Sequence, residues 1–169
     1  TLTDRPQAIV QFEILRLKNP NNQQVNFLLG LLYLNQGSTV PAIDLFKKAT
    51  SDPSLYADAH YHLGTIADRK GDISDALKHY RQVRNGRNYL AAASRTALLL
   101  TELQGLNIAR IYLQQLRAEQ PDQSPSLFQV ESNLLLGSNQ ADQAFTLLSD
   151  GLKAHPNDIQ LLYARSMVA

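Results

Sequence analysis

The sequence predicts an all-α fold, an array of about ten antiparallel helices in which each helical pair packs mainly on its neighbours. The first observation behind this prediction is a repeat with a period of 34 residues, which relates Leu29 to Leu63, Gly30 to Gly64, Gly37 to Gly71, Ala42 to Ala76 and Phe46 to Tyr80. The second is that apolar residues recur at helical spacing between the glycines. The core should therefore be a long ribbon rather than a single centre.

The pattern has a physical reason: small residues allow two helices to pack closely, and a glycine ends the first helix of each pair. Gly30 and Ala42 are small enough to let two helices approach closely, and Phe46 can fill the space left against the next pair. Gly37 and Gly71 come where the first helix of a pair must end, and glycine adopts the left-handed C-terminal conformation without a Cβ penalty. Each repeat is therefore expected to be a helix, a turn and a second helix.

The helices can be placed in order along the chain. Residues 4–18 match the second helix of a pair, because Ala8 and Phe12 come one period before their counterparts in the next repeat. Asp72 is the expected N-cap of one later helix, and Asn139 replaces a turn glycine because asparagine tolerates a positive φ. The remaining helices are expected over residues 23–36, 40–51, 56–70, 73–84 and 90–103, around 109–116, over roughly 125–136, around 144–151, and over 158–169.

These helices form a single expected array over residues 1–169. Its expected parts are a half repeat at 4–20, complete repeats at 21–54, 55–88, 89–121 and 122–156, and a half repeat at 157–169. The array begins on the second helix of a pair and ends on the first helix of another. We therefore expect the chain to be a segment of a longer array, whose natural ends would carry polar capping helices.

Composition limits the classes of function. The chain has 16 basic and 15 acidic residues, and a net charge of +1 gives no general attraction to nucleic acid or to an anionic membrane. It contains no cysteine, which excludes disulfides and thiol chemistry. The longest apolar run, over residues 27–34, is too short to span a bilayer.

No pattern in the sequence predicts catalysis, a metal site or a cofactor. His60 and His62 are two positions apart on a helix, so they point to different faces, and no carboxylate four residues on completes a ligand set. The sequence has neither a G-x-S-x-G nucleophile turn nor a glycine-rich phosphate loop. We therefore expect a protein that is not an enzyme and has no cofactor.

The repeat resembles the tetratricopeptide repeat family over almost the whole chain. The motif is most specific in the first two complete repeats, where the first reads Leu29-Gly30-x2-Tyr33-x3-Gly37-x4-Ala42-x3-Phe46-x2-Ala49. This resemblance implies a right-handed superhelix that binds peptides or protein segments in its concave groove, without catalysis. It also implies that the first helices of successive pairs line that groove.

The positions that this resemblance places in the groove recur once in each repeat. The fifth residues of the first helices are aromatic, arginine or amide side chains, which are common at protein interfaces. Gln160 and Met167 hold the second and ninth positions of the last such helix. Alternatively, some of these side chains pack inside neighbouring repeats. The predicted partner-binding residues are Phe27, Leu31, Asp58, Tyr61, Thr65, Arg95, Leu99, Gln129, Asn133 and Tyr163.

Charge is unevenly distributed along the chain. Acids are absent between Asp75 and Glu102, whereas six occur from Glu119 onward, including Glu131. A solvated surface of mixed sign is the simpler interpretation, and a docking patch for a charged partner is the alternative. The basic residues of that possible patch are Lys78, Arg81, Arg84 and Arg87, with Arg95 further along.

A narrower resemblance depends on the pattern Ala76-Leu77-x2-Tyr80-Arg81-Gln82-Val83-x2-Gly86-x2-Tyr89-x2-Ala92-x2-Arg95-x-Ala97-x-Leu99-Leu100. This stretch is similar to the bacterial outer-membrane tetratricopeptide lipoproteins, some of which deliver envelope proteins to a carboxyl-terminal processing protease. The resemblance implies a periplasmic or outer-membrane location and a lipid anchor outside this segment, with the cytoplasm as the alternative. An RNA-binding helical-repeat protein and a structural spacer in a larger assembly are the other classes left open.

Overall fold

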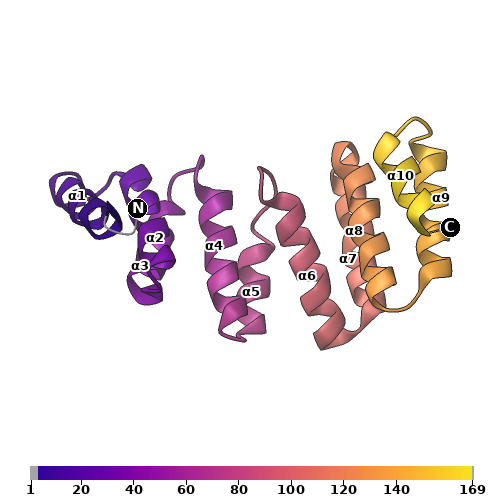
Figure 1. The fold of residues 1–169 in the computed structure, drawn as a ribbon, viewed down its shortest axis with the longest axis horizontal. Coiled ribbons are helices and arrows are strands. Elements are labelled where there is room, and N and C mark those ends of the chain that lie inside the picture. The colour runs from indigo at the N-terminus through magenta and orange to yellow at the C-terminus, as the bar shows by residue number, and fades with distance from the viewer. Residues whose placement is uncertain (1–3, 169) are drawn as a thin grey trace. The chain divides into compact units, whose positions relative to one another are not determined.

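The predicted all-α fold is confirmed by the computed structural model, which describes residues 4–168. Ten α-helices and one short 3₁₀ helix make up this part of the chain, and it contains no strand. Figure 1 shows the helices following one another as a succession of hairpins. Their bounds are α1 (Asp4–Lys18), α2 (Gln23–Asn35), α3 (Thr39–Ala49), α4 (Tyr56–Arg69), α5 (Ile73–Tyr80), α6 (Tyr89–Gln104), α7 (Leu106–Glu119), η1 (Pro121–Gln123), α8 (Ser124–Gly137), α9 (Ala141–Ala154) and α10 (Ile159–Val168).

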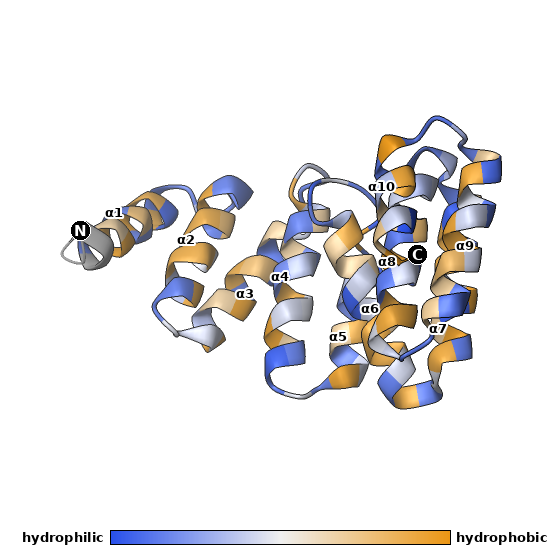
Figure 2. Cartoon of the chain, turned by 45° about the vertical axis from the view of Figure 1, so that its right-hand side comes forward, coloured by the Kyte–Doolittle hydropathy of each residue, from blue (hydrophilic) through white to orange (hydrophobic). Residues whose placement is uncertain are grey.

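The chain divides into two compact units, with the boundary in the sequence between Tyr89 and Leu90. We call them the N-terminal unit, with α1 to α5, and the C-terminal unit, with α6 to α10. In both, hydrophobic and hydrophilic residues alternate along the helices at intervals of about a turn (Figure 2), as expected when each helix buries one face. Within residues 4–168, no helix combines the length and the hydropathy needed to cross a membrane.

Local backbone chemistry places the helix ends where the sequence predicts them. Gly37 and Gly71 have φ values of 86° and 77°, which is the left-handed conformation expected after the first helix of a pair. Asn139 has a φ of 57° and takes the same role in the C-terminal unit. The carboxylate of Asp72 accepts a hydrogen bond from the backbone N–H of Asp75 at 3.0 Å, so it caps α5 as predicted.

The end of α5 is an exception, because the helix stops at Tyr80 rather than at the predicted residue 84. The following residues form a loop that is tied back to α4. Asn88 and Arg87 both donate hydrogen bonds to the carboxylate of Asp58, at 2.9 and 3.1 Å. Val83, within this loop, is buried. The residues after Tyr80 thus make tertiary contacts in place of a further helical turn.

Glycine and aromatic residues pack directly against each other in the N-terminal unit. A Cβ added to Gly30 would lie 3.0 Å from the ring of Phe46, and one added to Gly64 would lie 2.8 Å from the ring of Tyr80. The ring of Phe46 therefore lies on the glycine of its own pair. It also stacks on His62 of the next pair, with ring centroids 5.1 Å apart, so the predicted contact with the next pair is present as well.

The C-terminal unit uses the same contact with the two helices exchanged. Here the glycine is Gly151 of α9 and the aromatic residue is Phe128 of α8, which would lie 3.0 Å from an added Cβ. α6 and α7 are separated by Gly105 alone, whose φ of 94° allows a tight turn. The helices of the α8–α9 pair thus approach each other as closely as those of the N-terminal pairs, but the glycine lies on the second helix and not on the first.

Candidate protein-binding surface

Two of the predicted groove residues are core residues in the structure. Phe27 is only 4% exposed, packs edge-to-face on Phe46 at 5.6 Å and is covered by His62 at 5.8 Å. Leu99 on α6 is 2% exposed. The prediction that these side chains are open to a partner is therefore wrong, because neighbouring helices cover the faces on which they lie. Leu31 is half-buried and packs against the same cluster as Phe27.

Tyr61 and Thr65 lie together on α4 and remain partly open. The ring of Tyr61 lies 6.0 Å from the ring of Tyr80, and the hydroxyl of Thr65 donates to the carbonyl of Tyr61 at 2.9 Å. Tyr80 donates to Asp68 at 3.1 Å, and burial raises the pKa of its hydroxyl to about 12. This network fixes the surface around Tyr61. Asp58, on the same helix, is occupied by the loop that follows α5.

The four basic residues of the possible docking patch, Lys78, Arg81, Arg84 and Arg87, are all exposed. They lie on the last turns of α5 and in the loop that follows it. Arg87 forms an ion pair with Asp58 at 3.1 Å, which neutralises part of the charge of the patch. The patch as a docking site stays a prediction.

A pair of histidines joins α4 and α5, and it was not predicted. The Nδ1 atoms of His60 and His79 are 2.9 Å apart, so one ring donates to the other. The ring of Tyr56 covers His60 at 4.5 Å, and the carboxylate of Asp75 lies 3.7 Å from Nε2 of His79. His62 contacts a different set of side chains, as its position in the helix indicates. Among residues 4–168, no group of three or more potential ligands is arranged to hold a metal ion.

We expect this pair to make the stability of the N-terminal unit depend on pH. Burial, followed by the charges of His79 and Lys78, lowers the pKa of His60 to about 4, and burial also lowers that of His79 despite Asp75. The unfolded chain binds these protons below pH about 6.5 and the folded chain does not, so stability is complete above that pH and falls toward pH 4.

The loss between pH 7 and pH 5 should be on the order of 1 kcal/mol, after allowance for the partial exposure of the rings. Urea unfolding at the two pH values measures it. A variant that carries both His60→Phe and His79→Leu should show a flatter profile. A profile equally steep in this variant would mean that other groups cause the dependence.

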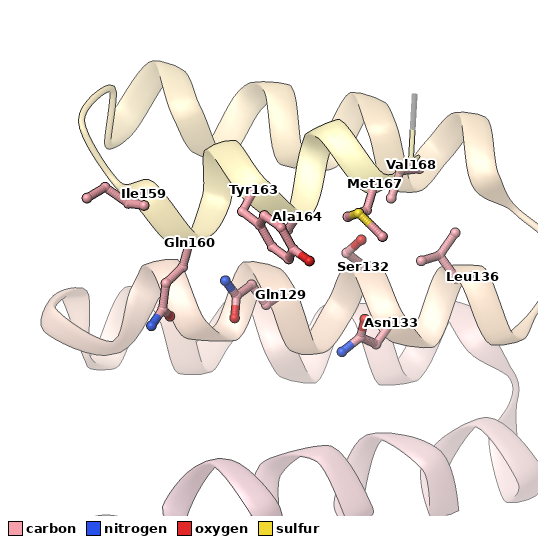
Figure 3. Close-up of a pocket in the computed structure, with 10 residues that line it drawn as sticks. All are labelled: Gln129, Ser132, Asn133, Leu136, Ile159, Gln160, Tyr163, Ala164, Met167 and Val168. Atoms are coloured by element: carbon pink, nitrogen blue, oxygen red, sulfur yellow. The ribbon is translucent and has the colours of Figure 1, made fainter.

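In the C-terminal unit, three of the predicted residues come together at one pocket. Gln129 and Asn133 of α8 face Tyr163 of α10 across a pocket of about 610 Å³ (Figure 3). Arg95, on α6, is half-buried and does not line this pocket. The lining consists of Gln129, Ser132, Asn133, Leu136, Ile159, Gln160, Tyr163, Ala164, Met167 and Val168.

The sequence pattern accounts for only part of this lining. Gln160 and Met167 hold repeat positions that it assigns to the groove, and both line the pocket. Ser132, Leu136, Ile159, Ala164 and Val168 were missed. All of these except Val168 lie three or four residues from a predicted position, so helical neighbourhood is the signal that could have found them.

A buried ion pair holds α8, which forms one wall of the pocket, against α7. Glu131 is 2% exposed and accepts from Arg110 at 2.9 Å and from Arg117 at 2.5 Å. Arg117 also lies over the ring of Phe128 at 4.3 Å, and Arg110 donates to Gln143 of α9. Glu131 is therefore part neither of a solvated charged surface nor of a docking patch, the two alternatives left open for the uneven charge distribution. It fixes the position of α8 instead.

Paired helices repeated at a fixed period define a helical-repeat protein. The chain belongs to the tetratricopeptide repeat family, whose profile matches residues 1–56 and 42–89.

One protein of known sequence and two solved structures illustrate what the chain is similar to. The chain is 36% identical over 111 residues to TPR repeat-containing protein PA4667 of Pseudomonas aeruginosa, a match that covers 66% of this chain and 19% of that protein. It thus spans about a fifth of the length of this relative. The crystal structure of MamA is similar with a TM-score of 0.63 at 20% identity, covering 92% of this chain and 91% of that one. YrrB, described as a TPR protein with an unusual peptide-binding site, is similar with a TM-score of 0.58 at 17% identity, covering 98% and 85%.

Proposed function

We propose that this protein is a non-catalytic scaffold or adaptor that binds a segment of a partner protein, with the pocket between α8 and α10 as its principal site. The observation that carries this proposal is the convergence of Gln129, Asn133 and Tyr163 on one open pocket. The volume of about 610 Å³ is in the range of ligand pockets in proteins. Peptide binding by YrrB, which has the same fold, also supports it.

The other open positions extend the proposed contact within each unit. In the N-terminal unit, Tyr61 is partly exposed, its ring contacts that of Tyr80, and Thr65 lies beside it. We propose it as the partner-binding side chain of that unit, with Asp58 supporting the loop next to it. In the C-terminal unit, Arg95 on α6 is the proposed basic contact. Phe27 and Leu99 are left out because they are buried.

Competition between variants tests this proposal. The chain with a photoreactive p-benzoylphenylalanine at position 163 is irradiated in an envelope extract of Pseudomonas aeruginosa, the organism of the curated relative. Addition of chain without the photoreactive group should reduce the amount of crosslinked partner, because both chains bind the same site on it. Chain carrying Tyr163→Ala and Asn133→Ala should compete at least about 30-fold less well, since an anchor at an interface commonly contributes about 2 kcal/mol or more.

The matched control is Phe145→Ala, which removes another exposed aromatic side chain of the same unit away from the pocket. This variant should compete as well as the parent chain. If the pocket variant competes fully and reversal of the charges at Arg81 and Arg84 abolishes competition, the pocket is not the site and the basic patch is.

We further propose that the full-length protein is an adaptor of the bacterial envelope, tethered by an anchor outside this segment, that delivers substrates to a carboxyl-terminal processing protease. The similarity of the stretch from Ala76 to Leu100 to such lipoproteins supports this role. Addition of the purified protein to such a protease and a crosslinked partner should accelerate cleavage of the partner. An unchanged cleavage rate, together with capture of the partner in the pocket, would restrict the function to that of a scaffold.

A further inference from the structure

The pocket of the C-terminal unit lies on a face that a paired helix does not cover. α9 packs on α8 as its partner helix, yet Gln129 remains half-buried and Asn133 exposed. Tyr163 and Met167 hold the same repeat positions on α10 and are 66% and 71% exposed. Both helices therefore present side chains of the same repeat positions to the pocket.

The lining of the pocket is entirely uncharged. Figure 3 shows Gln160 and Gln129 toward one end of the pocket and Asn133 toward the other, with Tyr163 between them. Apolar side chains lie at both ends, Ile159 beside Gln160 and Leu136 beyond Met167. The pocket thus has amides along its length that can both donate and accept hydrogen bonds, interspersed with apolar side chains. The flexible thioether of Met167 can adapt to apolar side chains of different shapes.

This chemistry discriminates between classes of partner segment. A carboxylate or an ammonium group placed in the pocket would lose hydration without gaining an opposite charge among the lining side chains, which is unfavourable. An extended main chain has N–H and C=O groups that match the amides of Gln129, Asn133 and Gln160. Aliphatic or aromatic side chains of the same segment would bury apolar surface against Leu136 and Met167.

We infer that the pocket between α8 and α10 takes an uncharged, apolar stretch of the partner protein in extended conformation. The amides bind the main chain of that stretch, and the apolar lining residues contact its side chains. This inference deepens the proposed function and depends on it. It separates this site from the basic patch of the N-terminal unit, whose exposed arginines and lysine would select an acidic partner.

A display library of random linear peptides provides the test. Peptides selected on the intact chain should be enriched in aliphatic and aromatic residues and depleted in Asp, Glu, Lys and Arg relative to the unselected library. The affinity of the selected peptides should change less than about twofold between about 0.1 and 1 M salt, since no ion pair forms. Tyr163→Ala and Asn133→Ala should each weaken binding about tenfold, whereas Phe145→Ala should leave it unchanged.

The possible failures are distinguishable. Selection of charged peptides whose affinity falls steeply with salt but still depends on Tyr163 would overturn the inferred chemistry and leave the proposed function in place. Enrichment of no peptide that depends on Tyr163 or Asn133 would overturn both. Self-association of the chain in sedimentation experiments, abolished by Tyr163→Ala and not by peptide, would make a second copy the occupant and overturn the inference. Circular dichroism of each variant verifies that these exposed substitutions leave the helices intact.

Discussion

Glu131→Ala should lower the free energy of unfolding by about 3 kcal/mol or more, which is the cost of breaking a buried ion pair by removing one partner. The carboxylate is 2% exposed and accepts from two arginines of α7, and Arg117 is itself only 13% exposed. Without Glu131, Arg117 loses the carboxylate that pairs with it in this buried position. Urea unfolding followed by circular dichroism measures the loss, and hydrogen exchange should locate it in α7 and α8.

An exposed ion pair of the same unit is the matched control for this prediction. Lys153 and Asp150 of α9 are 2.7 Å apart, but their side chains are 78% and 57% exposed. Asp150→Ala should therefore cost less than about 1 kcal/mol, as exposed pairs do. Equal losses of unfolding free energy for Asp150→Ala and Glu131→Ala would show that burial does not determine how much an ion pair contributes to stability.

Gly64→Leu should destabilise the N-terminal unit by about 1 to 3 kcal/mol through overpacking. Even the first added atom would lie 2.8 Å from the ring of Tyr80, which is closer than carbon atoms approach without strain. The ring cannot easily move away, because it is 2% exposed and its hydroxyl is bonded to Asp68. Ala76, fully buried on the facing helix α5, should show a similar loss on replacement by Leu.

Gly137→Leu is the control for this second prediction. Gly137 is also helical, but a Cβ added there meets nothing within 4 Å. The substitution should be neutral or slightly stabilising, because glycine is a poor helix former. A comparable loss at Gly137 and Gly64 in urea titrations would mean that the cost comes from the helix backbone and not from the contact with Tyr80.

The features that the sequence predicted correctly depend on local backbone chemistry. The positive φ of Gly37, Gly71 and Asn139 follows from the residue types that tolerate it, and the cap by Asp72 follows from a carboxylate placed just before a helix. The period of 34 residues then orders the helices. The contact of Gly64 with an aromatic ring could be anticipated because both residues recur at that period.

The sequence by itself determined the class of fold, the order of the helices and the positions that can face a groove. Only the tertiary structure decided which of those positions are open. Phe27 and Tyr163 hold the same repeat position, yet one is in the core and the other is 66% exposed. The burial of Glu131 and the contact between His60 and His79 also depend on how neighbouring helices pack. Helical periodicity specifies which side chains share a face, whereas the packing of neighbouring helices specifies whether that face is covered.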